Sequence, residues 1–192
     1  MGETALGGKA DVGFLPGDES HGFVVQAVDV LDDYHGMGRA FKHRATGMEV
    51  YHVANDDPEC VFGFIFKTPP LNDSGAPHII EHSILAGSKR YPVKDPFMAL
   101  LKGSVNTFMN AMTYPDFTVY PAASVLPKDF MNLFAVYSDA VFNPLLRQET
   151  FWQEGIRLVV DADGVPHFDG VVFNEMKGEM SDHDSIVARQ SI

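Results

Sequence analysis

The stretch that decides the fold of this 192-residue chain is CVFGFIFKTPPLNDSGAPHIIEHSILAG, residues 60–87. Its first nine residues are mostly apolar, aromatic or β-branched, which predicts a strand over 60–68. Residues 69–77 are typical of a turn, and Pro77 suits the first turn of a helix. A helix that ends near Gly87 is expected to follow, so the stretch predicts a strand joined directly to a helix.

Three more strands are predicted before this stretch. The segment FVVQAVDVL (23–31) is β-branched, and GRAFKHRATGMEVYHVAND (38–56) is typical of two strands around a turn at 45–47. Residues 1–20 are rich in glycine and lack periodicity, so we expect a flexible N-terminal arm. The remaining residues, 21–192, are then expected to form one domain.

Helices dominate after the stretch. The residue pattern predicts a short helix at 97–102, a strand near 117–120, a helix over 127–146, a helix running into a strand over 147–164 and a helix over 170–185. Strands joined by hairpins therefore come first and helices later. This order predicts the α+β class with a mostly antiparallel sheet, rather than alternating βαβ units.

Composition and charge exclude several classes of protein. With 45% apolar and 21% charged residues, the chain has the composition of a globular protein rather than a disordered one. The net charge of −12 argues against a nucleic-acid partner, because phosphate binding needs a basic surface. No apolar run approaches the roughly 20 residues of a membrane-spanning helix, so we expect no membrane partner. A single cysteine, Cys60, excludes an internal disulfide.

His78, Glu81 and His82 stand out within the predicted helix. Residues four apart lie one turn apart on the same helix face, so both imidazoles can point at one metal ion. A catalytic zinc site takes three protein ligands and a water, and zinc lowers the pKa of that water toward about 7. Glu81 would flank the same face and could accept a proton from the water and pass it to a leaving amine. A chance grouping on a partly exposed helix remains the alternative at this point.

A third ligand is available in FNEMKGEMSD, residues 173–182. Glu175 and Glu179 are themselves four residues apart and could both face one site, with Asp182 further on. The spacing does not choose between the two glutamates. A solvated helix face is the alternative for either of them.

Several separate motifs, in the same order and spacing, resemble the N-terminal domain of the presequence proteases and their relatives. These are zinc metallopeptidases of the inverzincin, pitrilysin type, in peptidase family M16, subfamily C. The motifs are HIIEH (78–82), FMNAMTYPDFTVYP (108–121), PKDFMNLFAVYSDAVFNPLL (127–146), FWQEGIRL (151–158) and GVVFNEMKGEMSD (170–182). The similarity runs from about residue 20 to the end of the chain.

The resemblance implies one zinc ion held by His78, His82 and Glu175 rather than Glu179, with Glu81 as the catalytic base. It also implies that Asn110 and Ala111 lie on an edge strand that receives the substrate. A peptide would dock there as an added β-strand. From the residue type alone, a turn or capping role is favoured for Asn110.

The resemblance further implies an α+β fold whose helices pack on one face of the sheet. Relatives contain four such domains in two halves, so the expected partners are C-terminal M16 domains and short unfolded peptides. The chain ends inside a helical pattern at DSIVARQSI (184–192), which suggests a truncated first domain. Without groups from the other half, the chain is expected to be weak or inactive as a peptidase. A bacterial cytoplasm, or an organelle matrix in a eukaryote, is the expected compartment.

The motif FWQEGIRL is interpreted mainly as packing. Phe151 and Trp152 are expected to anchor a helix, and Glu154 and Arg157 to form an ion pair.

Two other functions are considered. A non-catalytic peptide-binding or scaffold domain of the same fold is one, although the intact HIIEH and Glu175 argue against it for the parent protein. An enzyme that cleaves S-ribosylhomocysteine is the other, because such enzymes also use H-x-x-E-H. They take a cysteine as third ligand, however, and Cys60 precedes the motif in a predicted strand.

Overall fold

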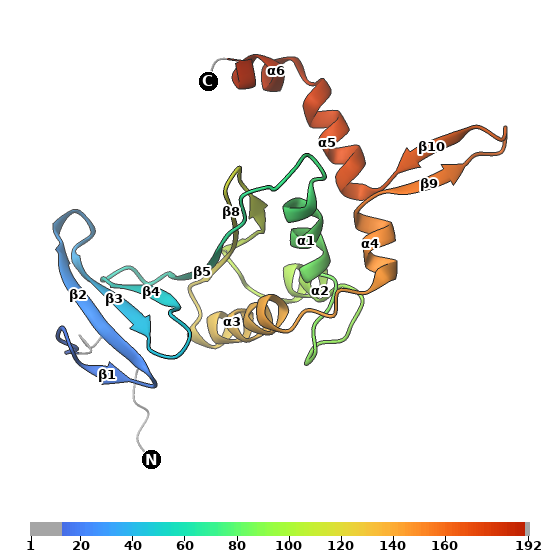
Figure 1. Cartoon of the computed structure of the whole chain (residues 1–192). Helices are drawn as coiled ribbons and strands as arrows, with labels where there is room; N and C mark the ends of the chain where they lie inside the picture. Colours follow the sequence, from blue (N-terminus) through green and yellow to red (C-terminus); the bar gives the residue numbers. More distant parts are fainter. Residues whose placement is uncertain (1–12, 191–192) are drawn as a thin grey trace. The chain divides into compact units, whose positions relative to one another are not determined.

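The computed structural model describes residues 13–190, and these form two compact units (Figure 1). One unit ends at Pro58 and the other begins at Glu59. The predicted domain, 21–192, includes residues of both units, and its boundaries stay a prediction. Within the described residues, no helix is both long and apolar enough to cross a membrane.

The first unit is a four-stranded antiparallel sheet in the order β1-β2-β3-β4. Its strands are β1 (Glu19–Ser20), β2 (Phe23–Leu31), β3 (Gly36–His43) and β4 (Glu49–Ala54), with a 3₁₀ turn η1 (Asp32–Tyr34) between β2 and β3. The turn before β4 closes where Gly47, at a φ of 71°, donates its N–H to the carbonyl of His43 at 2.8 Å.

The three strands predicted in this region are confirmed. The prediction of a flexible arm over residues 1–20 is wrong at its last two residues, because Glu19–Ser20 forms strand β1 and pairs with β2. The first twelve residues of that arm lie outside the described part of the chain.

The second unit is built around strand β8 (Phe117–Ser124). Strand β5 (Cys60–Lys67) pairs with β8 along its whole length in antiparallel register. The short strands β6 (Phe108–Met109) and β7 (Met112–Thr113) also pair antiparallel with β8, so they occupy its other edge. The expected antiparallel pairing is thus confirmed, while the residue pattern did not predict β6 and β7.

The core of this unit lies on one face of the sheet. Along β5 the odd-numbered side chains face outward, with Ile65 69% exposed, whereas the aromatic residues at 62, 64 and 66 face helix α3 (Pro127–Phe142). Phe62 meets Tyr137 edge to face at 5.4 Å between ring centroids. Ile84 of helix α1 (Ala76–Ile84) joins the same cluster. Helices therefore pack on one face of this sheet, as the family resemblance implied.

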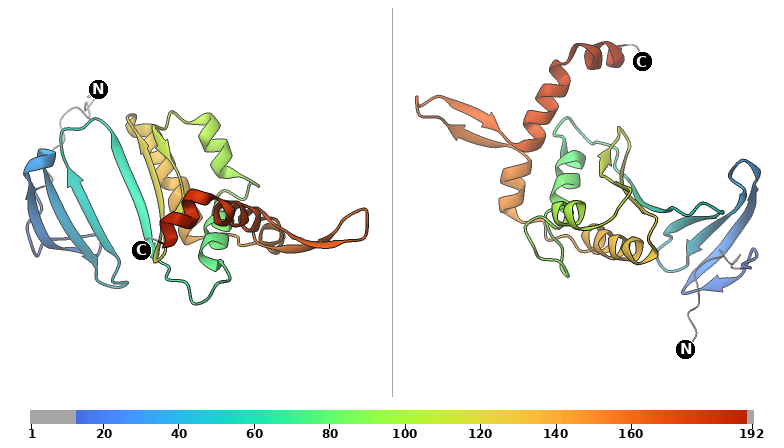
Figure 2. Two further views of the ribbon diagram at one scale, coloured as in Figure 1. Left: turned by 90° about the horizontal axis from the view of Figure 1, so that it is seen from above. Right: turned by 180° about the vertical axis from the view of Figure 1, so that it is seen from behind.

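The remaining elements follow in chain order. They are α2 (Pro96–Gly103), α4 (Gln148–Glu154), β9 (Arg157–Val160), β10 (Pro166–Asp169), α5 (Val171–Ser181) and α6 (His183–Gln190). Strands β9 and β10 form an antiparallel hairpin, which both views of Figure 2 show extending away from the junction of α4 and α5. The predicted helix over 170–185 is two helices, because Asp182 adopts an extended conformation between them. The helix predicted to reach 146 ends at Phe142, shortly before Pro144.

Candidate metal centre

Helix α1 presents the two histidines of the motif on one face. It begins after Gly75, which has a φ of 70°, and Pro77 lies in its first turn as predicted. The ring centroids of His78 and His82 lie 5.0 Å apart. The neighbouring Ile84 is buried in the core and fixes the orientation of the helix.

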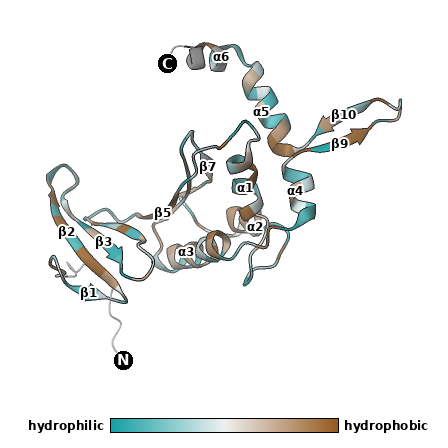
Figure 3. Cartoon of the chain, in the orientation of Figure 1, coloured by the Kyte–Doolittle hydropathy of each residue, from teal (hydrophilic) through white to brown (hydrophobic). Residues whose placement is uncertain are grey.

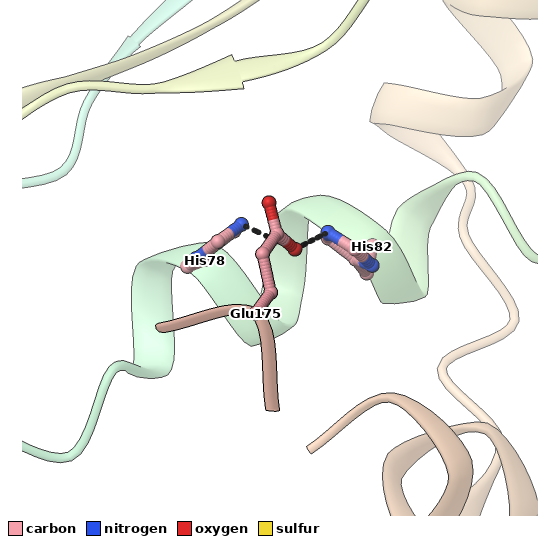
Figure 4. Close-up of side chains that lie close together, drawn as sticks. All are labelled: His78, His82 and Glu175. Atoms are coloured by element: carbon pink, nitrogen blue, oxygen red, sulfur yellow. Dashed lines mark ion pairs between the residues drawn. The ribbon is translucent and has the colours of Figure 1, made fainter. Parts of the chain in front are cut away.

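Glu175 of α5 reaches the two imidazoles from a different part of the chain (Figure 4). Its Oε2 lies 3.7 Å from Nε2 of His78 and 3.5 Å from Nε2 of His82. One ligand atom from each of the three residues can be chosen so that all lie within 4.8 Å of one another. The histidine side chains are 19% and 23% exposed and that of Glu175 is 54% exposed. The cluster is therefore accessible from solvent on the carboxylate side.

These three side chains fit a zinc ion. Ligands bound to zinc at 2.0–2.1 Å and at tetrahedral angles are separated by about 3.3 Å. The observed nitrogen–oxygen distances of 3.5 and 3.7 Å are close to that value. Two histidines and one glutamate are also a donor set of catalytic zinc sites, which keep one position open.

Glu179, the other candidate ligand, is engaged elsewhere. Its Oε1 accepts a hydrogen bond from the hydroxyl of Ser185 at 2.8 Å. Asp182 accepts the backbone N–H of the same serine at 3.0 Å. Of the glutamates in α5, Glu175 is thus the one that the fold brings to the histidines. Figure 3 shows that α5 begins with hydrophobic residues and becomes more hydrophilic toward Glu179.

Glu81 lies beside the cluster and is buried, with 6% of its surface exposed. The hydroxyl of Thr113 in β7 donates to its Oε2 at 2.6 Å, a length typical of a hydroxyl bonded to a carboxylate. The Thr113 hydroxyl lies 3.4 Å from that of Thr118, which in turn lies 2.8 Å from that of Thr68. A row of hydroxyl groups thus connects Glu81 with the sheet.

His82 has a second carboxylate neighbour. Its Nδ1 lies 3.1 Å from Oε2 of Glu154, the last residue of α4. The side chain of Glu154 is only 14% exposed. Its Oε1 accepts a hydrogen bond from Nε2 of Gln153 at 2.8 Å.

The predicted Glu154–Arg157 ion pair is wrong. Arg157 instead pairs with Asp169 and donates to the backbone carbonyl of Trp152 at 2.9 Å. The aromatic pair of this motif is also not an internal anchor, because Phe151 is 46% and Trp152 49% exposed.

A network of polar contacts ties α5 to the hairpin before it. Asn174 donates to Oδ1 of Asp169 at 2.8 Å, while the other oxygen of that carboxylate meets Arg157. The hydrogen bond from Asn174 is the largest of the effects that lower the pKa of Asp169. Because Asn174 precedes Glu175, this network fixes the start of the helix that carries the third ligand candidate.

Asn110 and Ala111 lie in the connection between β6 and β7. The Asn110 side chain accepts the N–H of Ala111 at 3.0 Å, so it makes the local backbone contact that its residue type favours. Its backbone N–H bonds to the carbonyl of Pro121 at 3.1 Å. Both residues line a cavity of about 1140 Å³. The same cavity is lined by the two histidines, Glu175 and Glu81.

Thr113 and Glu154 contact the site residues but were not predicted to do so. Threonine in a two-residue strand carries no periodic signal, and the position of Glu154 beside His82 depends on how α4 packs against α1.

Comparisons with known proteins agree on one family. Residues 69–162 match the family model described as insulinase, peptidase family M16. The chain is 49% identical over 174 residues to presequence protease 1, chloroplastic/mitochondrial, of Arabidopsis thaliana, covering 89% of this chain and 16% of that protein. It is 45% identical over 180 residues to the mitochondrial presequence protease of Danio rerio, covering 92% of this chain and 18% of that protein.

A solved structure gives the same result for the fold. The crystal structure of pitrilysin matches with a TM-score of 0.56 and 26% sequence identity, over 67% of this chain and 14% of that one. The chain therefore spans less than a fifth of the length of the two presequence proteases and of pitrilysin.

Proposed function

This chain belongs to peptidase family M16, and from that premise we propose that it is the metal-binding and proton-transferring part of a zinc-dependent endopeptidase. The observation that carries the proposal is the convergence of His78, His82 and Glu175 beside the buried Glu81. Two imidazole nitrogens and a carboxylate oxygen brought together in this way are a donor set that a zinc ion would bind.

In this proposal the three side chains hold zinc, and each other residue has a separate task. A bound zinc ion would polarise a peptide carbonyl and lower the pKa of a water toward about 7. Glu81 accepts a proton from the attacking water and delivers it to the leaving amine. Thr113, which donates to one oxygen of Glu81, keeps that carboxylate oriented during both transfers.

The proposed substrates are short, unfolded peptides. Strands β6 and β7 form one edge of the sheet in the second unit, and the connection between them lines the cavity that contains the cluster. A peptide added at this edge would bring its backbone past Glu81, as in other complexes formed by β-strand addition. Asn110 and Ala111 are the proposed contacts for it.

We further propose that the chain works with additional M16 domains. The support is its length, which is 16–18% of that of the presequence proteases it matches. Groups that stabilise the oxyanion would come from those domains, and one such donor accounts for about 10²–10³-fold in rate. The 192-residue chain by itself should thus bind zinc and cleave peptides slowly. The compartment, bacterial cytoplasm or organelle matrix, stays a proposal.

The test combines zinc binding with peptide cleavage. The wild-type chain and Glu81→Gln should both bind one zinc ion, because Glu81 is not a ligand in this scheme. Only the wild type should cleave an unstructured peptide in long incubations, or at normal rates when joined to its further domains. Cleavage by Glu81→Gln at the wild-type rate would disprove the role of the base. Peptide binding without cleavage by zinc-loaded wild type would favour the scaffold alternative.

A further inference from the structure

We propose that Glu154 is a positioning residue that fixes the imidazole of His82 for metal binding. This inference rests on the proposed function, because it assigns a role next to the same metal site. Glu154 would act through His82 and would touch neither the zinc ion nor the substrate.

The direction of the hydrogen bond between His82 and Glu154 supports this role. A carboxylate only accepts hydrogen bonds, so Nδ1 of His82, 3.1 Å from Oε2 of Glu154, is the nitrogen that carries the hydrogen. In the neutral ring the lone pair then lies on Nε2. That atom is the one that faces Glu175, at 3.5 Å. The contact therefore selects the tautomer that can bind a metal at the cluster.

Glu154 is itself held in place by its surroundings. Only 14% of its side chain is exposed, and Gln153 donates to its other oxygen at 2.8 Å. Helix α4, which ends at Glu154, packs against α1, the helix of His82. A carboxylate with a fixed position can hold an imidazole ring at one angle, whereas a mobile surface carboxylate cannot.

Polar contacts join α4, the hairpin and α5, which supply both carboxylates around the ring of His82. Arg157 connects the last turn of α4, through the carbonyl of Trp152, with Asp169 at the end of the hairpin. Asn174 then connects Asp169 with α5. As a result Glu154 and Glu175 belong to elements joined by polar contacts, and they meet opposite nitrogens of His82.

His78 offers an internal comparison. Its Nε2 faces Glu175 at 3.7 Å, like that of His82. Among residues 13–190, however, the structure shows no carboxylate bonded to the other nitrogen of His78. The proposal therefore predicts that Glu154 affects one of the two histidines and leaves the other unchanged.

Four variants of the 192-residue chain test the proposal by zinc titration. Glu154→Ala should lower the zinc affinity by about 10–100-fold, the usual effect of removing such a partner. Glu154→Asp keeps the charge but is shorter, so it should lose a similar amount. Glu154→Gln keeps an acceptor oxygen at the same position and should recover most of the affinity. Glu149→Ala is the matched control, because it removes an exposed carboxylate from the same helix and should leave the affinity unchanged.

A second readout does not depend on affinity. In the zinc-loaded wild type, the Nδ1 proton of His82 should be protected from exchange and visible by NMR, and in Glu154→Ala it should be lost while signals of His78 persist. Circular dichroism of each variant checks that it folds. Unchanged affinity and unchanged protection in Glu154→Ala would overturn this inference alone. A wild-type chain that binds no zinc would overturn the proposed function and this inference together.

Discussion

Nε2 of His82 lies 3.5 Å from Oε2 of Glu175, although the two residues belong to helices α1 and α5 at opposite ends of the second unit's sequence. The carboxylate oxygen that meets His82 also lies 3.7 Å from Nε2 of His78. One oxygen atom is thus shared between two imidazoles, and the three residues together are a donor set that a zinc ion would bind.

Replacing Glu175 by Gln should lower zinc affinity by more than about 100-fold, since a ligand contributes more than an outer partner does. Glu179→Gln removes the same charge one turn further along α5 but leaves the cluster intact. It should change zinc affinity little. Isothermal titration with zinc compares the two variants. Equal losses in both would refute Glu175 as the third ligand.

Removing the hydroxyl of Thr113 should slow peptide cleavage without affecting zinc binding. Thr113→Val keeps the shape of the side chain but deletes the donor to Glu81, and a hydrogen bond to a charged group contributes about 1.5–3 kcal/mol. Thr113→Ser keeps the donor and should retain most of the cleavage rate. The measurement is the rate of cleavage of a fluorogenic peptide at saturating zinc. A full rate in Thr113→Val would show that Glu81 needs no such partner.

The core beneath α1 can be tested independently of the chemistry. Leu133 of α3 has no exposed surface, so Leu133→Ala should reduce the free energy of unfolding by about 2–5 kcal/mol. Met131 lies on the same helix but is 59% exposed, and Met131→Ala should cost far less. Urea unfolding followed by circular dichroism gives both values. Similar costs for the two variants would contradict the position of this core.

The network at Asp169 predicts a dependence of stability on pH. Its pKa is lowered in the folded chain, first by the hydrogen bond from Asn174 and also by the charge of Arg157. A lowered pKa means that the contribution to stability is present above the unfolded value of about 4 and is lost as the pH falls through the folded value. Thermal unfolding of wild type and Asp169→Asn should therefore differ at pH 7 and converge in acid. A difference that stayed constant with pH would show that ionisation of Asp169 has no part in it.

The local elements of the fold could be predicted well from the sequence. The apolar, aromatic and β-branched residues of 60–68 predicted β5, and the helical spacing of apolar residues after Pro127 predicted α3, because such residues form the buried face of each element. The two-residue strands β6 and β7 were missed, since two residues are too few to show alternation. They become strands only because β8 offers them a free edge.

Arg157 shows how an error arises. Three residues apart on a helix, Glu154 and Arg157 would be neighbours, which made an ion pair plausible. Helix α4 ends at Glu154, however, and Arg157 begins β9. Its partner is Asp169, which lies directly opposite it in the hairpin register. Because α4 ends before Arg157, the neighbour of Arg157 is Asp169 across the hairpin rather than Glu154.

The sequence by itself determined that His78 and His82 share a helix face next to Glu81, because the spacing of residues within one turn is a local property of the backbone. Residue spacing left Glu175 and Glu179 open, although the family resemblance pointed to Glu175, and the tertiary structure brings Glu175 to the histidines. Only the tertiary structure decided that Glu154 and Thr113 bond to His82 and Glu81. Contacts between separate helices and strands depend on how the elements pack around the core, and residue spacing along the chain does not specify that packing.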